Sequence, residues 1–457
     1  MRRQTKLNAV MFVVVALCVA VSVVLAFALI SGKETTKAVD ENKEQLDAVV
    51  EVNNEKNSQQ KKTDIMQSVS VKEKEADSFS AIELAKVSNV AFDVESEFSD
   101  ISRVSFVAVG DNIIHSTVMS DAATLAEGTD KEYNFVPMFE NVADIIEEAD
   151  VAFINQEAPI AGKSRGYAGY PMFNSPEQVV YDLSEIGFDI FNIANNHMLD
   201  RHTSGYKSTI DFYKENNYFY LGGFENKEDY ENIRIMEKDG ITIAFLSYTY
   251  GTNGLVLDKN SEMIIPLCDS YSNDEIDRQS KLARELADVV VVSMHWGAEH
   301  WSDSFNPIAL QKKQAEILVN NNVDVIIGTH PHALEPMLWM DRPDGKRTLV
   351  MYSLGNFLSG MEYMRNHVGG IAGFDFVKIA DEVHVSDVYF IPTLCHFNNR
   401  VRSFKIYKLS EYTPELLRQH GTQVRGTDTQ RSMEYLYSIV DATIDKEFLV
   451  EDFYKNR

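Results

Sequence analysis

Cysteine, proline and glycine are scarce in this chain of 457 residues, and their scarcity excludes several classes of protein. Three cysteines, one of them in an apolar leader, are too few for a disulfide-rich scaffold. Cys268 and Cys395 could pair, but the sequence gives no distance between them, and we expect two inert thiols. Eleven prolines and 23 glycines argue against a collagen-like or largely disordered chain.

Basic residues are also few, since 43 Lys and Arg stand against 69 Asp and Glu, for a net charge of -26. Phosphate binding by a broad surface draws on clustered Lys and Arg, so we expect no nucleic-acid partner. The hydrophobic share of 44% is ordinary for a globular protein, and the length allows two or three domains.

A long apolar run is present at the N-terminus, where residues 8–30 follow Arg2, Arg3 and Lys6. As a helix rising about 1.5 Å per residue, this run can cross a hydrocarbon core of about 30 Å. Positive charges before it predict a cytoplasmic N-terminus. We therefore expect a single-pass anchor over residues 1–31, with the rest of the chain extracellular at the cell membrane. A long cleaved signal peptide is the alternative, although no convincing cleavage site follows the run.

The composition changes after the apolar run and again near residue 100. Residues 33–100 carry nine lysines against sixteen acidic residues and few aromatics, so they cannot bury enough apolar surface to fold. We predict a polar flexible linker over 32–100, a main domain over 101–408 and a helical C-terminal extension over 409–457. Most of the net negative charge falls on the part from residue 101 onward.

Five β-rich apolar runs each stop at residues that can bind a metal. The runs cover 104–109, 150–154, 189–194, 289–294 and 323–328. The residues that follow them are Asp111, Glu157, Asn196 with His197, His295, and His330 with His332. Helical segments lie between or beside the runs, at 138–149, 176–186, 204–216, 274–287 and 307–321. Strands alternating with helices predict βαβ units and a largely parallel sheet core.

The carboxyl ends of such strands meet at one edge of a sheet, where ligands bind. We therefore expect the five strand ends to bring their polar side chains together. Carboxylates with imidazoles and an amide oxygen suit Mn²⁺, Mg²⁺, Fe or Zn²⁺ better than a soft thiolate site would. A lone histidine after a strand is usually a surface or capping residue, but five strand ends together favour a divalent-metal site.

Other candidates carry weaker signals. Glu299, four residues after His295, is either a supporting residue behind the ligands or a solvated loop carboxylate. Lys163 and Arg165 follow Glu157 and could contact an anionic substrate, although a solvated loop is an equal interpretation. His115 could approach the site from beyond Asp111. We treat most of the remaining histidines as incidental, namely His202, His300, His367, His384, His396 and His420.

Six motifs in this order resemble those of one family. They are Gly110-Asp111, Asn155-Gln156-Glu157, Ala194-Asn195-Asn196-His197, His295-Trp296-Gly297-Ala298-Glu299, Gly328-Thr329-His330-Pro331-His332 and Tyr352-Ser353-Leu354-Gly355-Asn356-Phe357. Together they resemble the CapA family of poly-γ-glutamate capsule biosynthesis proteins, which is similar in turn to the calcineurin-like metallophosphoesterases. The resemblance covers roughly residues 103–408, and a membrane anchor also fits CapA-type proteins.

The resemblance implies a fold and a set of site residues. The expected fold is α/β, a four-layer α/β/β/α metallophosphoesterase-like sandwich behind an N-terminal transmembrane helix, with two mixed sheets and one or two divalent ions at one edge. The implied metal ligands are Asp111, Glu157 as a bridging carboxylate, Asn196 through its amide oxygen, His295, His330 and His332. His197 resembles the histidine that acts on the reacting group as acid or stabiliser. Asn112 and Asn356, from the matching motifs, are candidate substrate contacts.

The chain departs from the phosphoesterase pattern at two motifs. Ile113 stands where the first motif usually has a histidine, which leaves one metal position a ligand short. Met198 stands where an acidic residue usually follows the Asn-His pair, and Asp200 is the nearest substitute, so we count it with His197 among the catalytic candidates. Many CapA members also have histidine in place of Thr329. Both a single ion and a pair of ions remain open.

Two functions from different classes follow. The first is a metal-dependent hydrolase or transferase that acts outside the cell on the anionic capsule polymer or on a phosphoester. An acidic domain repels polyglutamate, so binding would need a local positive field from the metal, Lys163 and Arg165. The second is a non-catalytic assembly or export component that binds the membrane subunits of a capsule synthase. A phosphodiesterase unrelated to capsule would keep the fold and change only the substrate.

Overall fold

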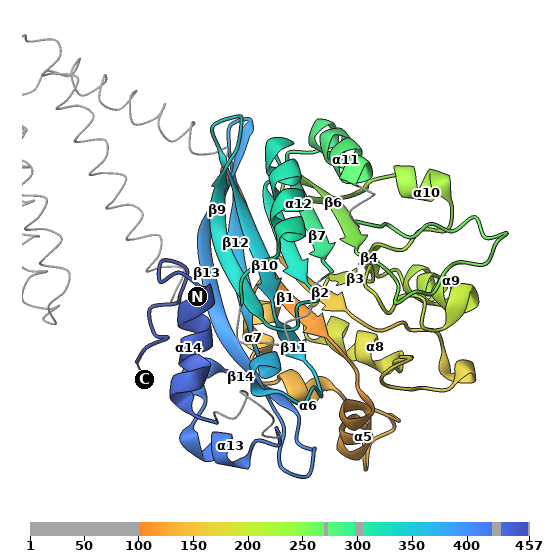
Figure 1. Ribbon diagram of the computed structural model, residues 1–457, viewed down its shortest axis with the longest axis vertical. Helices are drawn as coiled ribbons and strands as arrows, with labels where there is room; N and C mark the ends of the chain where they lie inside the picture. Colours follow the sequence, from red (N-terminus) through yellow and green to blue (C-terminus); the bar gives the residue numbers. More distant parts are fainter. Residues whose placement is uncertain (1–100, 269–272, 298–304, 423–430, 456–457) are drawn as a thin grey trace, which may run out of the picture. The chain divides into compact units, whose positions relative to one another are not determined.

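The computed structural model describes residues 101–268, 273–297, 305–422 and 431–455 of the chain (Figure 1). The predicted anchor at 1–31, the predicted linker at 32–100 and Glu299 lie outside these residues. Within the ranges described, we find no helix with the length and apolar character needed to span a membrane.

The first sheet has eight strands and is mixed. Its strands are β1 (Ile101–Asn112), β2 (Val151–Gln156), β3 (Ile190–Asn192), β4 (Phe219–Leu221), β11 (Asn356–Leu358), β12 (Val368–Ile379), β13 (Glu382–His396) and β14 (Lys405–Lys408). Their order is β14-β13-β12-β1-β2-β3-β4, and β11 pairs with the end of β1. Strands β1 to β4 run parallel, whereas β12, β13 and β14 pair antiparallel.

The second sheet has six strands and is also mixed. They are β5 (Arg234–Lys238), β6 (Ile241–Thr249), β7 (Val289–His295), β8 (Val325–Thr329), β9 (Leu334–Asp341) and β10 (Arg347–Leu354). The order is β5-β6-β7-β8-β10-β9, with a parallel centre and an antiparallel strand at each edge. The prediction of parallel strands is correct for one half of the first sheet, β1 to β4, and for the centre of the second sheet.

The helices in the described residues match four of the five predicted segments as single elements, and those at 116–125 and 227–231 were not predicted. They are α5 (Ser116–Leu125), α6 (Val136–Phe139), α7 (Ala143–Glu147), α8 (Gln178–Glu185), α9 (His202–Glu215), α10 (Lys227–Glu231), α11 (Asn273–Leu286), α12 (Ala309–Asn320), α13 (Pro414–Gln419) and α14 (Met433–Thr443). In the part of the chain that the structure describes, the short 3₁₀ turns are η2 (Lys163–Arg165), η3 (Met364–His367) and η4 (Leu409–Glu411). The single helix expected at 138–149 is divided into α6 and α7, because Val142 leaves helical geometry with φ -129° and ψ -3°.

Side-chain alternation on the strands separates the layers. On β1, Phe106 and Ala108 face the second sheet and share a buried cluster with Phe245 of β6. Val107 and Val109 point the other way and pack with residues of the helices α5 to α9. The outer face of the second sheet packs on α11 and α12. The described residues therefore form helical, sheet, sheet and helical layers, and the expectation of two mixed sheets flanked by helices is confirmed.

The C-terminal extension joins the core between the sheets. Helix α14 packs against β9, and its Leu436, Ile439 and Val440 are buried in the same cluster as Phe106. Figure 1 shows α13 and α14 beside the long strand β13. The extension thus packs on the sandwich; the boundaries that we assign to it and to the main domain remain a prediction.

One close backbone contact shapes the edge where the strands end. A Cβ atom added at Gly110 would lie 1.8 Å from the carbonyl oxygen of Gly355, so only glycine fits here. The amide of Asp111 donates to the same oxygen over 3.0 Å. Gly355 itself has a φ of 68°, which favours glycine. This contact pairs Asp111 with Asn356 and joins two of the motifs found in the sequence.

Candidate metal centre

The predicted ligands converge at one edge of the sandwich. Three come from the first sheet, where Asp111 lies near the end of β1, Glu157 follows β2 and Asn196 lies beyond β3. Three come from the second sheet, where His295 ends β7 and His330 and His332 follow β8. All six side chains are buried. The predicted meeting of five strand ends is what the structure shows.

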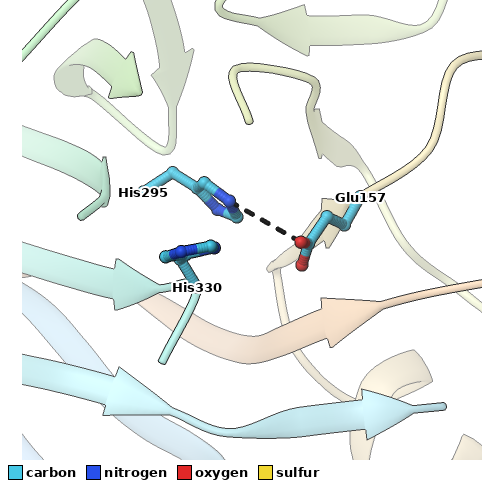
Figure 2. Close-up of side chains that lie close together, drawn as sticks. All are labelled: Glu157, His295 and His330. Atoms are coloured by element: carbon cyan, nitrogen blue, oxygen red, sulfur yellow. Dashed lines mark ion pairs between the residues drawn. The ribbon is translucent and has the colours of Figure 1, made fainter. Parts of the chain in front are cut away.

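Glu157 belongs to two overlapping groups of possible ligands. Ligand atoms of Glu157, His295 and His330 all lie within 4.8 Å of one another, and so do those of Asp111, Glu157 and His332. Figure 2 shows the Glu157 carboxylate facing the imidazoles of His295 and His330, with Oε1 3.7 Å from Nε2 of His295. This arrangement fits the bridging role that the resemblance implies for Glu157.

The remaining ligand candidates contact these groups directly. The Asn196 Oδ1 lies 2.9 Å from Nε2 of His295. His332 lies between the two carboxylates, with Nδ1 3.2 Å from Oδ2 of Asp111 and Nε2 3.5 Å from Oε1 of Glu157. An amide oxygen, two carboxylates and three imidazoles therefore surround one small region.

The backbone of the His-Pro-His segment is strained. His330 has a φ of 88° and His332 a φ of 53°, a region that non-glycine residues adopt at a cost. Two contacts hold the segment, since the His330 amide donates to Oδ2 of Asp111 over 3.2 Å and Asn366 Nδ2 donates to the His332 carbonyl over 2.8 Å. Strain of this kind commonly marks functional sites.

The donor set fits a divalent metal. Burial, together with the neighbouring histidines, lowers the pKa of His295 and of His330 well below the usual value, so both rings are neutral and able to bind a metal. Among the residues described, the buried Nδ1 of His330 has no hydrogen-bond partner. An unpartnered buried nitrogen is costly unless something else binds it.

His197 is paired with Asp200 next to these ligands. The His197 Nδ1 lies 2.8 Å from Oδ2 of Asp200, and that oxygen also accepts from the Phe173 amide over 2.7 Å. The Phe173 ring packs edge-on against His197 at 4.7 Å. Asp200 therefore orients His197, while Met198, which stands at the usual acidic position, is buried in the hydrophobic layer.

Residues 105–361 match the model of the bacterial capsule synthesis protein PGA_cap family. The chain belongs to this family. The resemblance to CapA proteins is therefore confirmed.

Two curated relatives agree with this assignment. The chain is 31% identical over 193 residues to the capsule biosynthesis protein CapA of Bacillus anthracis, covering 42% of this chain and 45% of the relative. It is 28% identical over 289 residues to the PGA biosynthesis protein CapA of Bacillus subtilis, covering 62% of this chain and 70% of the relative. The match thus spans less than half the length of the Bacillus anthracis protein.

Two solved structures are weakly similar in shape. One is a phosphatase from Mycoplasma pneumoniae, with a TM-score of 0.40 and 12% identity, covering 70% of this chain and 98% of that one. The other is the calcineurin-like phosphoesterase YfkN from Bacillus subtilis, with a TM-score of 0.39 and 13% identity, covering 64% of this chain and 90% of that one.

In this PGA_cap family member, the two asparagines predicted to contact substrate are hydrogen-bonded to other residues of the protein. Asn356 Oδ1 lies 3.0 Å from Nδ1 of His332, and its amide donates to the Asn366 carbonyl. Asn112 donates to Oε1 of Gln156 over 2.7 Å, and no residue in the described ranges is hydrogen-bonded to its buried Oδ1. Asn356 thus supports His332, and contact of either asparagine with substrate remains a prediction.

The two basic residues predicted to meet an anionic substrate have partners elsewhere. Lys163 lies in η2 with 67% of its side chain exposed, and it pairs with Glu132 at 2.5 Å. Arg165 donates to the backbone carbonyls of Ala161 and Ser204. Neither is hydrogen-bonded to the ligand candidates in the part of the chain that the structure describes, so their predicted role stays untested.

Sequence reasoning missed a polar network behind the ligands. Asn155 donates to Oδ1 of Asp111 over 2.7 Å, and Asn192 donates to Oδ1 of Asn155 over 2.8 Å. The Thr329 hydroxyl lies 2.9 Å from Nδ1 of His295 and so leaves the Nε2 of that ring toward Glu157. The sequence signal that could have revealed this network is that Asn155, Asn192 and Thr329 are polar residues at the ends of apolar strands.

A loop after β6 also reaches the centre. The Tyr250 ring lies 4.6 Å from that of His330, and Asn253 Oδ1 accepts from the Asn196 amide over 3.2 Å. This loop has no hydrophobic period, so the sequence offered no signal for either contact.

Proposed function

We propose that this PGA_cap family protein is a metal-dependent hydrolase or transferase that acts outside the cell on the anionic capsule polymer or on a phosphoester. The observation that carries the proposal is the buried group of six ligand candidates beside the His197–Asp200 pair. A merely structural metal site would not need an oriented histidine next to it.

The residues that would hold the metal are Asp111, Glu157, Asn196, His295, His330 and His332. A bound divalent ion would lower the pKa of coordinated water and polarise a phosphoryl or carbonyl oxygen. The polar network of Asn155, Asn192 and Thr329 would keep the ligands oriented.

His197 is the group that would move a proton. Asp200 binds the Nδ1 side of the ring, so the Nε2 atom is the one left for a leaving group. The carboxylate would also stabilise the imidazolium before it gives up its proton. Phe173 restricts the ring further, because it packs against His197 while its amide is bonded to Asp200.

The negative charge of the chain opposes binding of the anionic substrate that we propose. The chain is acidic, and Lys163 is already paired with Glu132. We therefore expect an anionic substrate to bind only when divalent cations are present. The N-terminal anchor and contacts with the membrane subunits of a capsule synthase belong to the same proposal.

One feature favours a second function, a non-catalytic assembly or export component. Ile113, at the position where the phosphoesterase motif usually has histidine, is buried with Ala158 and Phe173. An apolar side chain there cannot bind a metal or a substrate oxygen. A protein of this kind would keep the metal for structure or recognition.

The test compares His197→Ala with His384→Ala in cells that make the capsule, because His384 is an exposed histidine on β13. We expect His197→Ala to abolish the capsule at a normal protein level and His384→Ala to leave it intact. The purified full-length variants are then assayed with bis(p-nitrophenyl) phosphate and a γ-glutamyl anilide. A capsule that persists in His197→Ala cells would refute the catalytic proposal and favour the assembly component.

A further inference from the structure

His115 lies just before α5 and is enclosed by two loops. The Gly360 amide donates to its Nδ1 over 3.1 Å, and its ring packs edge-on against Phe173 at 5.4 Å. A Cβ atom added at Gly169 would lie 2.4 Å from the Ser116 amide nitrogen, and one added at Gly360 would lie 3.1 Å from the His115 Cβ. The two loops therefore pack closely around this residue and determine where its ring lies.

The Gly360 contact also determines which ring nitrogen carries the proton. A backbone amide only donates, so the Nδ1 of His115 must accept and a neutral ring carries its proton on Nε2. The Ile113 carbonyl lies 3.3 Å from the same Nδ1. That contact is longer, and the carbonyl already accepts from the backbone amide of His115 over 3.0 Å. The Gly360 bond therefore decides the tautomer.

His115 lies beside the candidate centre. Its ring and that of His197 both pack against Phe173, at 5.4 Å and 4.7 Å. Burial lowers the pKa of His115 to about 4, with the Ile113 carbonyl acting in the opposite direction and His332 and His197 lowering it further. The ring is therefore neutral near pH 7. Within the described ranges, no acceptor is hydrogen-bonded to Nε2, so this atom offers an available donor.

We propose that the Nε2–H of His115 donates a hydrogen bond to an anionic oxygen of the substrate, a phosphoryl or carboxylate oxygen bound beside His197. The inference rests on the proposed function, which it deepens by adding a substrate-binding residue. The Nε2–H of His115 would also supply an acidic chain with a hydrogen-bond donor for an anion. Ile113 has no polar atom in its side chain to do so, and Lys163 is paired with Glu132.

Two variants separate this role from simple packing. His115→Asn keeps an oxygen where Nδ1 accepts from Gly360 but removes the donor at Nε2. His115→Gln places an amide N–H near the position of Nε2. The matched control is His384→Asn, the same change at an exposed site.

Binding is measured by calorimetry on the full-length, metal-supplied protein with two probes, inorganic phosphate and γ-glutamylglutamate. We expect His115→Asn to weaken binding of at least one probe by about tenfold to a hundredfold, the usual effect of losing a hydrogen bond to a charged group. His115→Gln should recover most of that affinity. The probe whose affinity falls identifies the class of anion.

Unchanged affinity in His115→Asn, or no affinity of the wild-type protein for either probe, would overturn the proposal. Thermal unfolding and metal content of each variant show whether the fold and the centre are intact. If His115→Asn is destabilised, full recovery of probe affinity in His115→Gln would still support the role. Because binding requires no turnover, an inactive protein whose phosphate affinity depends on His115 would refute the hydrolase and not this inference.

Discussion

His197 and Asp200 form a buried pair in which Nδ1 lies 2.8 Å from Oδ2, three residues apart in the sequence. The sequence predicts Asp200 as a catalytic candidate with His197, as the nearest substitute for the usual acidic residue at Met198, but it gives no sign of a direct contact between the two side chains. The carboxylate contacts His197 and the Phe173 amide.

Replacing Asp200 by Asn should lower kcat on an active phosphodiester or γ-glutamyl probe by roughly a hundredfold, because the imidazolium loses its stabilising charge. KM and metal content should change little, since Asp200 contacts none of the six ligand candidates among the described residues. Steady-state kinetics with metal analysis checks this. A loss of metal with unchanged kcat per bound ion would mean that Asp200 acts on the centre and not through His197.

Glu157→Gln should reduce metal content more than His295→Ala or His332→Ala does, since Glu157 belongs to both groups of ligand candidates and each histidine to one. Mass spectrometry of the full-length protein, supplied with Mn²⁺ or Zn²⁺ and then desalted, gives the number of ions per chain. His384→Ala serves as the control. Equal losses in all three ligand variants would indicate one shared ion and not two adjacent positions.

Gly110→Ala should lower the free energy of unfolding by about 1 to 3 kcal/mol or more, because the new Cβ would meet the Gly355 carbonyl oxygen. Gly251→Ala is a suitable control, since nothing lies within 4 Å of a Cβ added there. Urea unfolding of both variants measures the difference. Similar midpoints for the two would show that β1 and β11 can move apart without cost.

A group of buried histidines away from the metal centre should make stability depend on pH. Burial lowers the pKa of His367 and of His396 to about 4, and that of His420 well below its usual value. Unfolded histidine titrates near 6.5, so the unfolded chain binds more protons between about pH 4 and 6.5. Stability should therefore be complete above pH 6.5 and fall as the pH drops toward 4, by up to about 3 kcal/mol each for His367 and His396.

Urea unfolding at about pH 5 and about pH 7.5, with a chelator to remove metal effects, measures this dependence. His367→Gln cannot take up a proton and keeps a donor toward the Met361 carbonyl, which lies 2.9 Å from Nε2 of His367. Its stability should change less between the two pH values than that of the wild-type protein. An unchanged difference would mean that His367 is not the titrating group.

Much of the architecture was predictable from hydrophobic period and strand composition. Five apolar runs became strands of two mixed sheets, and α8, α9, α11 and α12 agree closely with the predicted segments. The helix expected at 138–149 was wrong as a single element, since period alone does not reveal the break at Val142. Cys268 and Cys395 are buried and not bonded to each other, as expected of inert thiols.

The sequence by itself determined which residue types stand at the ends of the strands, and therefore that carboxylates, an amide and imidazoles would meet at one edge. This was possible because parallel strands direct their carboxyl ends to the same side. Only the tertiary structure decided which of these side chains touch. Packing between separate segments of the chain decided these contacts. It placed Glu157 in two groups of ligand candidates and Asp200 against His197. It also paired Lys163 with Glu132 and placed the Gly360 amide on Nδ1 of His115. Distances of a few ångströms between such segments follow from the packing of the whole core, which no local pattern of residues records.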